Sequence, residues 1–154
     1  MILTAQEEFG LRCALSLARA GRDGSLTLSQ IAEAEGLTTA YAGKLMRLLV
    51  QAGLVDSTRG RSGGYALTRA PESISVAEVV GPLGGPFYDG EICTRPVSAS
   101  QLCVHNNDCA VRSLWSGMQG MIDRYLGQVS LTDLVSDEAT MNELRDRVVA
   151  QGEH

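Results

Sequence analysis

Residues 27–68 read TLSQIAEAEGLTTAYAGKLMRLLVQAGLVDSTRGRSGGYALT, and their pattern predicts the fold of the N-terminal half. Thr27 precedes Gln30 with the spacing of a capping box, which predicts that a short helix begins there and covers 28–35. Gly36 ends this helix, because glycine tolerates the left-handed backbone of a sharp turn. A second helix follows over 39–52, with an apolar stripe of Tyr41, Leu45, Leu48 and Leu49. Two helices joined by a tight glycine turn are typical of a helix-turn-helix.

The segment after the second helix predicts a β-hairpin with a basic tip. Two short β-prone runs, 54–58 and 65–68, flank Arg59-Gly60-Arg61-Ser62-Gly63-Gly64. Three glycines allow the backbone to turn and to approach another surface closely, and two arginines stand at the tip. The simplest alternative is a solvent-exposed hairpin without a partner. We favour a wing whose arginines reach phosphates or a narrow minor groove.

A winged helix-turn-helix predicts its own DNA contacts. The second helix of such a motif enters the major groove, where Thr and Lys side chains contact base edges and Lys and Arg hold phosphates. The expected contacts are Thr38, Thr39, Tyr41 or Ala42, Lys44 and Arg47 on the helix, and Arg59 and Arg61 on the wing.

The distribution of charge agrees with a DNA-binding surface. The whole chain has a net charge of −5, yet residues 38–69 hold five basic side chains and a single acid, which leaves +4. Residues 81–154 hold five arginines and ten acids, which leaves −5. Such asymmetry marks one surface for a polyanion and keeps the rest hydrophilic.

The remaining sequence predicts a mainly α fold in which the hairpin is the only β structure. Helical periodicity covers residues 5–20, and Ser75 with Glu78 has a second capping-box spacing, whose helix runs through Val80. We expect four segments: a winged helix-turn-helix domain over 1–80, a cysteine-bearing loop over 81–108, a dimerisation helix with a short capped helix over 109–135, and an acidic tail over 136–154, either a frayed helix or disordered.

The long helix predicted over 109–129 carries a heptad-like apolar seam. Its members are Val111, Trp115, Met118, Ile122, Tyr125 and Val129. An ordinary core helix packed on its own domain has the same pattern. We favour a dimer helix, because a winged-helix protein that reads a two-fold DNA site needs a partner surface.

Three of the four cysteines lie on or next to the Gly/Pro-rich loop. The spacing is Cys93-x9-Cys103-x5-Cys109, whereas Cys13 falls on an apolar face of the first helix and is expected to be a buried, small hydrophobic residue. In a reducing compartment, clustered cysteines are more often metal ligands or redox sensors than disulfides. Neither end is a CxxC knuckle, so a zinc ribbon matches poorly. An iron–sulfur cluster takes about four ligands, usually thiolates.

Three thiolates leave the identity of a fourth ligand open. The candidates are His105, Glu8, Asp108 and a residue of a partner subunit. His105 is near in sequence, although a histidine between polar neighbours is often simply solvated.

The chain resembles the IscR, NsrR and RirA group of winged-helix regulators. The resemblance covers residues 1–135 in the family's order, and the glycine-rich wing is its most specific mark. The matching stretches include 1–4, 28–33, 52–55, 59–67, 74–80, Cys109 with Leu114-Trp115, and 131–135. The resemblance implies a homodimer crossed by the long helix, a cluster held by the three loop cysteines, and regulation of genes for iron–sulfur assembly, iron supply, or nitric oxide and redox stress.

The resemblance also bears on the fourth ligand. In some relatives an acidic residue in the first helix of the other subunit completes the cluster, and Glu8 occupies that position. The histidine used by assembly-type regulators is replaced here by Arg112, and that of a redox-sensing relative by Arg12. Glu8 is therefore our first choice, and [4Fe–4S] is favoured over [2Fe–2S]. Gly43 stands where relatives often have an acidic or polar residue, so the operator is expected to differ from theirs.

The expected function is a DNA-binding transcriptional regulator, a repressor, that senses redox, iron or nitric oxide status through an iron–sulfur cluster. Alternatives are a thiol switch with a Cys103–Cys109 disulfide, a zinc-containing regulator, and an iron–sulfur electron-transfer protein. The chain has two histidines, His105 and His154, and no nucleophile–base arrangement is visible in the sequence. We therefore expect that the protein is not an enzyme. The absence of a signal-peptide pattern or a long apolar run predicts a cytoplasmic location.

Overall fold

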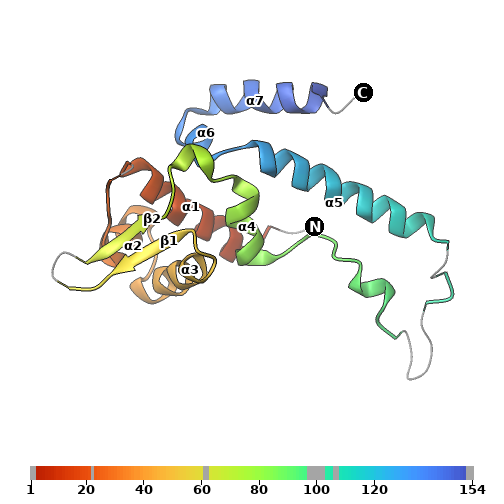
Figure 1. Cartoon of the computed structure of the whole chain (residues 1–154), viewed down its shortest axis with the longest axis horizontal. Helices are drawn as coiled ribbons and strands as arrows, with labels where there is room; N and C mark the ends of the chain where they lie inside the picture. Colours follow the sequence, from red (N-terminus) through yellow and green to blue (C-terminus); the bar gives the residue numbers. More distant parts are fainter. Residues whose placement is uncertain (1–2, 22, 61–62, 97–102, 106–107, 152–154) are drawn as a thin grey trace. The chain divides into compact units, whose positions relative to one another are not determined.

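The computed structural model describes residues 3–21, 23–60, 63–96, 103–105 and 108–151. The backbone divides into two compact units, Met1–Gly85 with Tyr125–His154, and Pro86–Arg124. The first unit begins with three helices and a hairpin, labelled in Figure 1: α1 (Ala5–Arg19), α2 (Leu28–Glu35), α3 (Thr39–Gln51), β1 (Val55–Thr58) and β2 (Gly64–Leu67). A 3-10 turn, η1 (Pro71–Ser73), then leads into α4 (Val76–Gly84).

The signals that predicted α2 act as expected. The Thr27 side chain accepts a hydrogen bond from the Gln30 N–H at 3.2 Å, and the Gln30 side chain accepts one from the Thr27 N–H at 2.9 Å. These bonds satisfy N–H groups that have no partner inside the helix. Gly36 ends the helix with φ of 64°, in the left-handed region. The helix-turn-helix reading is therefore confirmed.

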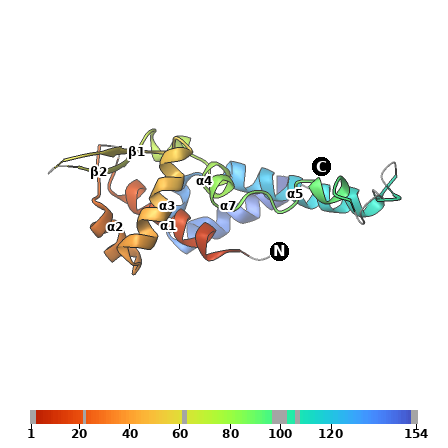
Figure 2. The same cartoon turned by 90° about the horizontal axis from the view of Figure 1, so that it is seen from below.

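The hairpin is a two-stranded antiparallel sheet, and both views show its strands side by side (Figures 1 and 2). Its register runs from Val55 opposite Leu67 to Thr58 opposite Gly64. Backbone hydrogen bonds in both directions between Leu26 and Tyr65, at 3.0 and 2.8 Å, fasten the hairpin to the segment before α2. The mainly α fold with a small β-hairpin is confirmed.

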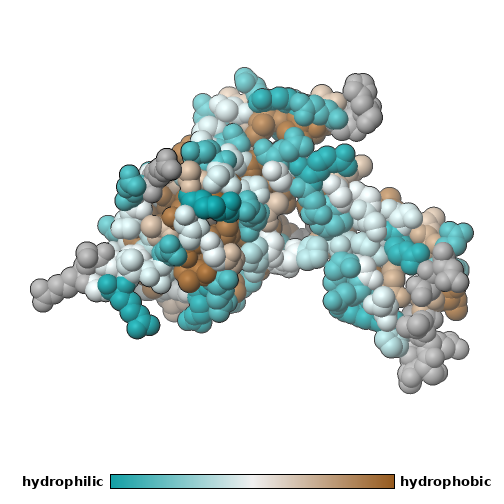
Figure 3. Space-filling model, in the orientation of Figure 1, coloured by the Kyte–Doolittle hydropathy of each residue, from teal (hydrophilic) through white to brown (hydrophobic). Residues whose placement is uncertain are grey.

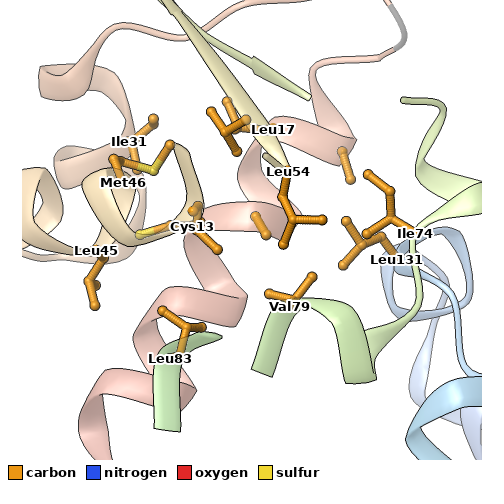
Figure 4. Close-up of a cluster of buried hydrophobic side chains, with 14 residues drawn as sticks. Cys13, Leu17, Ile31, Leu45, Met46, Leu54, Ile74, Val79, Leu83 and Leu131 are labelled. Atoms are coloured by element: carbon orange, nitrogen blue, oxygen red, sulfur yellow. The ribbon is translucent and has the colours of Figure 1, made fainter. Parts of the chain in front are cut away.

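The core of the first unit lies where its helices meet, and Figure 4 shows the side chains converging there. Each of α1, α2, α3 and α4 contributes fully buried apolar residues, as does the short helix α6 (Leu131–Val135). The members drawn and labelled are Cys13, Leu17, Ile31, Leu45, Met46, Leu54, Ile74, Val79, Leu83 and Leu131. The expectation that Cys13 is a buried hydrophobic residue is confirmed, because it is 0% exposed.

Helix α4 continues to Gly84, beyond the end predicted at Val80, and includes Pro82. Leu83 explains the extension, since it is only 2% exposed and packs where Gly10 of α1 leaves room. A Cβ at Gly10 would lie 2.5 Å from a Leu83 methyl carbon, so a larger residue there would force the Leu83 side chain to move. Tertiary packing thus overrides the helix-breaking tendency of the Gly-Pro segment.

The C-terminal part contains α5 (Ala110–Gln128), α6 and α7 (Glu138–Gln151). The long helix and the short capped helix match the predicted elements, and the acidic tail is helical over α7. Within the first unit, the Val76 N–H donates to the Val129 carbonyl at 2.8 Å and the Leu131 N–H to that of Ile74 at 3.0 Å. No helix in the described part of the chain is long and apolar enough to span a membrane.

Candidate DNA-binding surface and cysteine site

Helix α3 exposes one polar face opposite its buried face. Ala42, Leu45, Met46 and Leu49 are each 0% exposed and point into the core. The opposite face is exposed and carries Thr39, Ala40, Lys44, Arg47 and Gln51. No acidic residue occurs anywhere in α3, so this face presents positive charge and polar groups to solvent.

The first turn of α3 is fixed by its own cap. Thr38 lies before the helix, and its hydroxyl oxygen accepts a hydrogen bond from the Tyr41 N–H at 3.2 Å. The helix N-terminus also carries partial positive charge, which favours phosphate. Thr38 thus caps the helix at the place where DNA contact is expected. Its hydroxyl hydrogen remains available to donate a hydrogen bond.

The two neighbouring candidates in this turn lie differently. Ala42 is fully buried, so the alternative that placed it against DNA is wrong; helical geometry turns it toward the core. Tyr41 is half-buried and meets the Phe9 ring edge-on, with centroids 6.4 Å apart. Its packing against α1 accounts for its place in the predicted apolar stripe, while contact of its exposed part with DNA stays a prediction.

Ala40 is a further candidate, which the sequence pattern alone did not single out. It is exposed and lies four residues before Lys44 and seven before Arg47, and therefore on the same helical face. The helical spacing from Lys44 is the signal that identifies it. A methyl group at this position suits contact with the thymine methyl group in the major groove.

The wing depends on glycine for its shape. Gly60 has φ of 116°, which favours glycine strongly, and a Cβ at Gly63 would lie 2.5 Å from the Thr58 carbonyl oxygen. Arg59 is exposed beside this turn, whereas Arg61 lies outside the described residues. Arg69, counted in the basic segment, pairs with Glu78 at 2.6 Å, so its charge is largely compensated.

The cysteines of the second unit are free and partly accessible. Cys93, Cys103 and Cys109 are half-buried and none forms a disulfide. Cys93 ends a 3-10 turn, η2 (Glu91–Cys93), and Cys109 directly precedes α5. Among the described residues, no three His, Cys, Asp or Glu side chains form a group that could hold a metal ion.

The sulfur atoms of Cys93 and Cys109 have hydrogen-bonding neighbours among the described residues. The Tyr88 hydroxyl lies 3.2 Å from Cys93 Sγ, and the Arg112 N–H donates to Cys109 Sγ at 3.4 Å. The hydrogen bond with Cys93 is the main cause that raises the pKa of the Tyr88 phenol above its ordinary value. Burial and the electrostatic influence of Cys93 and Cys109 raise this pKa further, while Arg112 lowers it.

The chemistry of this donor set fits an iron–sulfur cluster. Cluster irons are held by thiolates, and hydrogen bonds to the sulfurs tune their properties. Three free thiols at positions 93, 103 and 109 would supply ligands of the right chemistry, although the described structure does not gather all three into one group. The Arg112 N–H donates to one of these sulfurs, and the Tyr88 hydroxyl lies at hydrogen-bond distance from another. The thiol of Cys13 does not belong to this set, since burial and the nearby charge of Glu35 raise its pKa to about 12.

The candidates for a fourth ligand are all accessible. Glu8 lies in the first unit, where its Oε1 accepts a hydrogen bond from Arg12 Nε at 2.7 Å. The Arg12 guanidinium also lies over the Phe9 ring, 5.9 Å from its centroid. His105 and Asp108 are exposed. The Glu8 carboxylate would leave its pairing with Arg12 to bind a metal, and an exposed pair of this kind is weak.

Comparison with known proteins gives consistent matches along the chain. A family described as "Rrf2: Iron-dependent Transcriptional regulator" matches residues 3–137. The HTH-type transcriptional regulator IscR of Xenorhabdus nematophila is 29% identical over 142 residues, covering 92% of this chain and 84% of the relative. The structure of CymR, the global cysteine regulator of B. subtilis, has a TM-score of 0.68 at 28% identity, covering 89% and 99% of the two chains. That of T. potens IscR also has 0.68, at 27% identity, with coverage of 88% and 86%.

Proposed function

Because the chain belongs to the Rrf2 family of transcriptional regulators, we propose that it is a cytoplasmic, homodimeric repressor whose DNA affinity depends on a cysteine-bound iron–sulfur cluster. Transcription regulation by a winged-helix protein follows from the family, and the cluster sensor is our proposal. The observation that carries it is the set of three free, half-buried thiols in the second unit, two of which have a hydrogen-bond partner at the sulfur atom.

On the DNA side, α3 would enter the major groove with its exposed face. Thr39 and Ala40 face base edges, while Lys44 and Arg47 contact phosphates or bases. Arg59 and Arg61 of the wing reach the backbone or the minor groove beside it. A homodimer repeats these contacts on both halves of a two-fold operator.

The surface of α5 supports the proposed dimer. None of its described residues is buried within the single chain. Large apolar side chains stay exposed, among them Val111 at 59%, Leu114 at 57% and Met121 at 67%. Figure 3 shows brown, apolar surface between hydrophilic patches on the 86–124 unit. A second copy of this helix would bury these side chains, and apolar patches of this kind mark association surfaces.

Four residues would hold the cluster. Cys93, Cys103 and Cys109 supply thiolates, and Glu8 of the partner subunit supplies a carboxylate. When bound, the cluster supplies one-electron redox chemistry and reactivity toward oxygen or nitric oxide. The protein contributes the ligands, the N–H and O–H donors at their sulfurs, and a continuous helix, α5, that begins next to Cys109. The cluster type proposed is [4Fe–4S].

A thiol regulator without a cluster is the second candidate. The free, partly accessible state of the three thiols favours it. This candidate predicts a colourless protein whose mass falls by about two units when a disulfide forms between two of them.

Anaerobic purification of the Glu8→Ala variant tests the proposed ligand set. We expect brown wild-type protein with visible cluster absorption and matching iron and sulfide content. The Glu8→Ala variant is expected to lose cluster or to show an altered spectrum, because one ligand is gone. Folding should persist, since an exposed ion pair contributes about 0–1 kcal/mol.

Arg12→Ala is the matched control. It breaks the same ion pair with Glu8 but leaves the carboxylate free to bind the cluster, so it should keep the wild-type spectrum. Equal iron content in wild type and Glu8→Ala would remove Glu8 from the ligand set. A colourless, iron-free wild type that folds normally would overturn the cluster proposal and leave the thiol regulator.

A further inference from the structure

The segment before Cys93 is fastened to α5 by contacts that lie inside the second unit. The Tyr88 N–H donates to Gln119 Oε1 at 2.8 Å, and Gln119 Nε2 donates to Asp123 Oδ1 at 2.6 Å. The Phe87 ring meets the Trp115 ring edge-on, with centroids 6.1 Å apart. Trp115, Gln119 and Asp123 are four residues apart and so share one stripe of the helix.

The same segment places a hydroxyl group against the Cys93 sulfur. Gly90 has φ of 75°, and the Cys93 N–H donates to the Gly90 carbonyl at 3.0 Å, so the chain turns tightly between Tyr88 and Cys93. This turn brings the Tyr88 hydroxyl to 3.2 Å from Cys93 Sγ. Both residues are half-buried, which limits the competition from water.

The direction of this hydrogen bond follows from the chemistry of a ligand. In a free thiol either atom can be the donor. A cysteine that binds iron is a thiolate and has no proton, so only the phenol can donate. We infer that Tyr88 is a positioning residue of the proposed cluster site, which donates its hydroxyl hydrogen to the Cys93 sulfur while Gln119 holds its backbone on α5. This inference rests on the proposed function.

Among the described residues, the Tyr88 hydroxyl group has its hydrogen bond with the Cys93 sulfur. Packing of the segment on α5 is supplied by the neighbouring Phe87 with Trp115, and its backbone anchor is Gln119, so neither contact needs a phenol. A phenylalanine at position 88 would preserve the ring and the N–H bond to Gln119. Such a variant would lose only the hydrogen bond between the hydroxyl group and the Cys93 sulfur.

A hydrogen bond at a ligating sulfur affects the reduction potential. Reduction adds negative charge to the cluster and its thiolates, and a donor at the sulfur stabilises the reduced form more than the oxidised form. Tyr88 would therefore raise the reduction potential. Because the Tyr88 N–H donates a hydrogen bond to Gln119, a change at the cysteine site would also act on α5 through Tyr88.

The test is the Tyr88→Phe variant of the full-length, anaerobically purified protein. We expect iron and sulfide content like wild type, a more negative midpoint potential in a redox titration, and an altered visible circular dichroism spectrum. Tyr65→Phe, which removes a phenol hydroxyl group from β2 in the first unit, is the matched control and should keep the wild-type potential. Gln119→Leu keeps the Tyr88 phenol but removes the acceptor of the Tyr88 backbone N–H. This variant should also have a more negative midpoint potential, with a smaller shift than Tyr88→Phe.

The results can distinguish failure of the proposed role of Tyr88 from failure of the cluster proposal. An unchanged potential in Tyr88→Phe with full cluster content would overturn the inference and leave the cluster proposal standing. Loss of cluster without any shift in the potential of the remaining fraction would overturn it too, because this result indicates a purely structural role. A wild-type protein without iron and sulfide would overturn the proposed function itself.

Discussion

Replacing Cys109 with serine should leave the protein without a stable cluster. A serine hydroxyl is a far poorer iron ligand than a thiolate, and Cys109 is one of only three loop thiols. Loss of an outer hydrogen-bond partner already costs about 10–100-fold in metal affinity, so loss of a ligand is expected to cost at least as much. Iron and sulfide analysis with visible absorption, after anaerobic purification, measures the effect.

Cys13→Ala is the control for this substitution. Cys13 is also a cysteine, but it is buried in the core of the first unit and its thiol stays protonated at neutral pH, because its pKa is raised to about 12. We expect this variant to lose some stability and to keep full cluster content. If Cys109→Ser retained wild-type iron and sulfide, the loop cysteines would not be the ligands.

The double substitution Lys44→Glu with Arg47→Glu should nearly abolish DNA binding. Both side chains lie on the exposed face of α3, and reversal of their charge replaces attraction to phosphate by repulsion. We expect a loss of affinity on the order of a hundredfold or more, and a salt dependence that weakens by about one unit for each lost phosphate contact. Fluorescence anisotropy with an operator selected from random DNA measures both effects.

A matched control reverses the charge of two basic side chains on a different helix. Arg145→Glu with Arg147→Glu on α7 alters the net charge equally and also lies at exposed positions. This variant should bind with nearly wild-type affinity, because the distant charges act only through a screened field. Equal losses in the two variants would mean that overall charge, and not the α3 face, governs binding.

Much of the fold was predictable because its signals are local. The capping boxes at Thr27 and Ser75, and the glycine turn at Gly36, depend on neighbouring residues and lie in the structure as expected. The end of α4 was not predictable in this way. Burial of Leu83 beside Gly10 decides it, and these residues are far apart in sequence.

In the candidate sites too, local patterns were predictable and contacts between distant parts of the sequence were not. Helical periodicity identifies the exposed face of α3, and with it Ala40. Ala42 was misplaced because each helical residue is turned by about 100° from the one before, which puts Ala42 on the buried face with Leu45, Met46 and Leu49. Spacing identifies the loop cysteines. It carries no signal for Tyr88 or Gln119, since their contact joins an irregular segment to a helix 31 residues away in sequence.

In the proposed function, the cysteine site controls the affinity of the protein for DNA. The most direct measurement compares the dissociation constants of the cluster-loaded protein and the chelator-stripped protein for the same selected operator, at one salt concentration and without oxygen. We expect the two constants to differ by about 5–150-fold, the range typical of coupled sites. Equal constants for a protein shown to carry iron and sulfide would contradict it, because the cluster would then have no influence on binding.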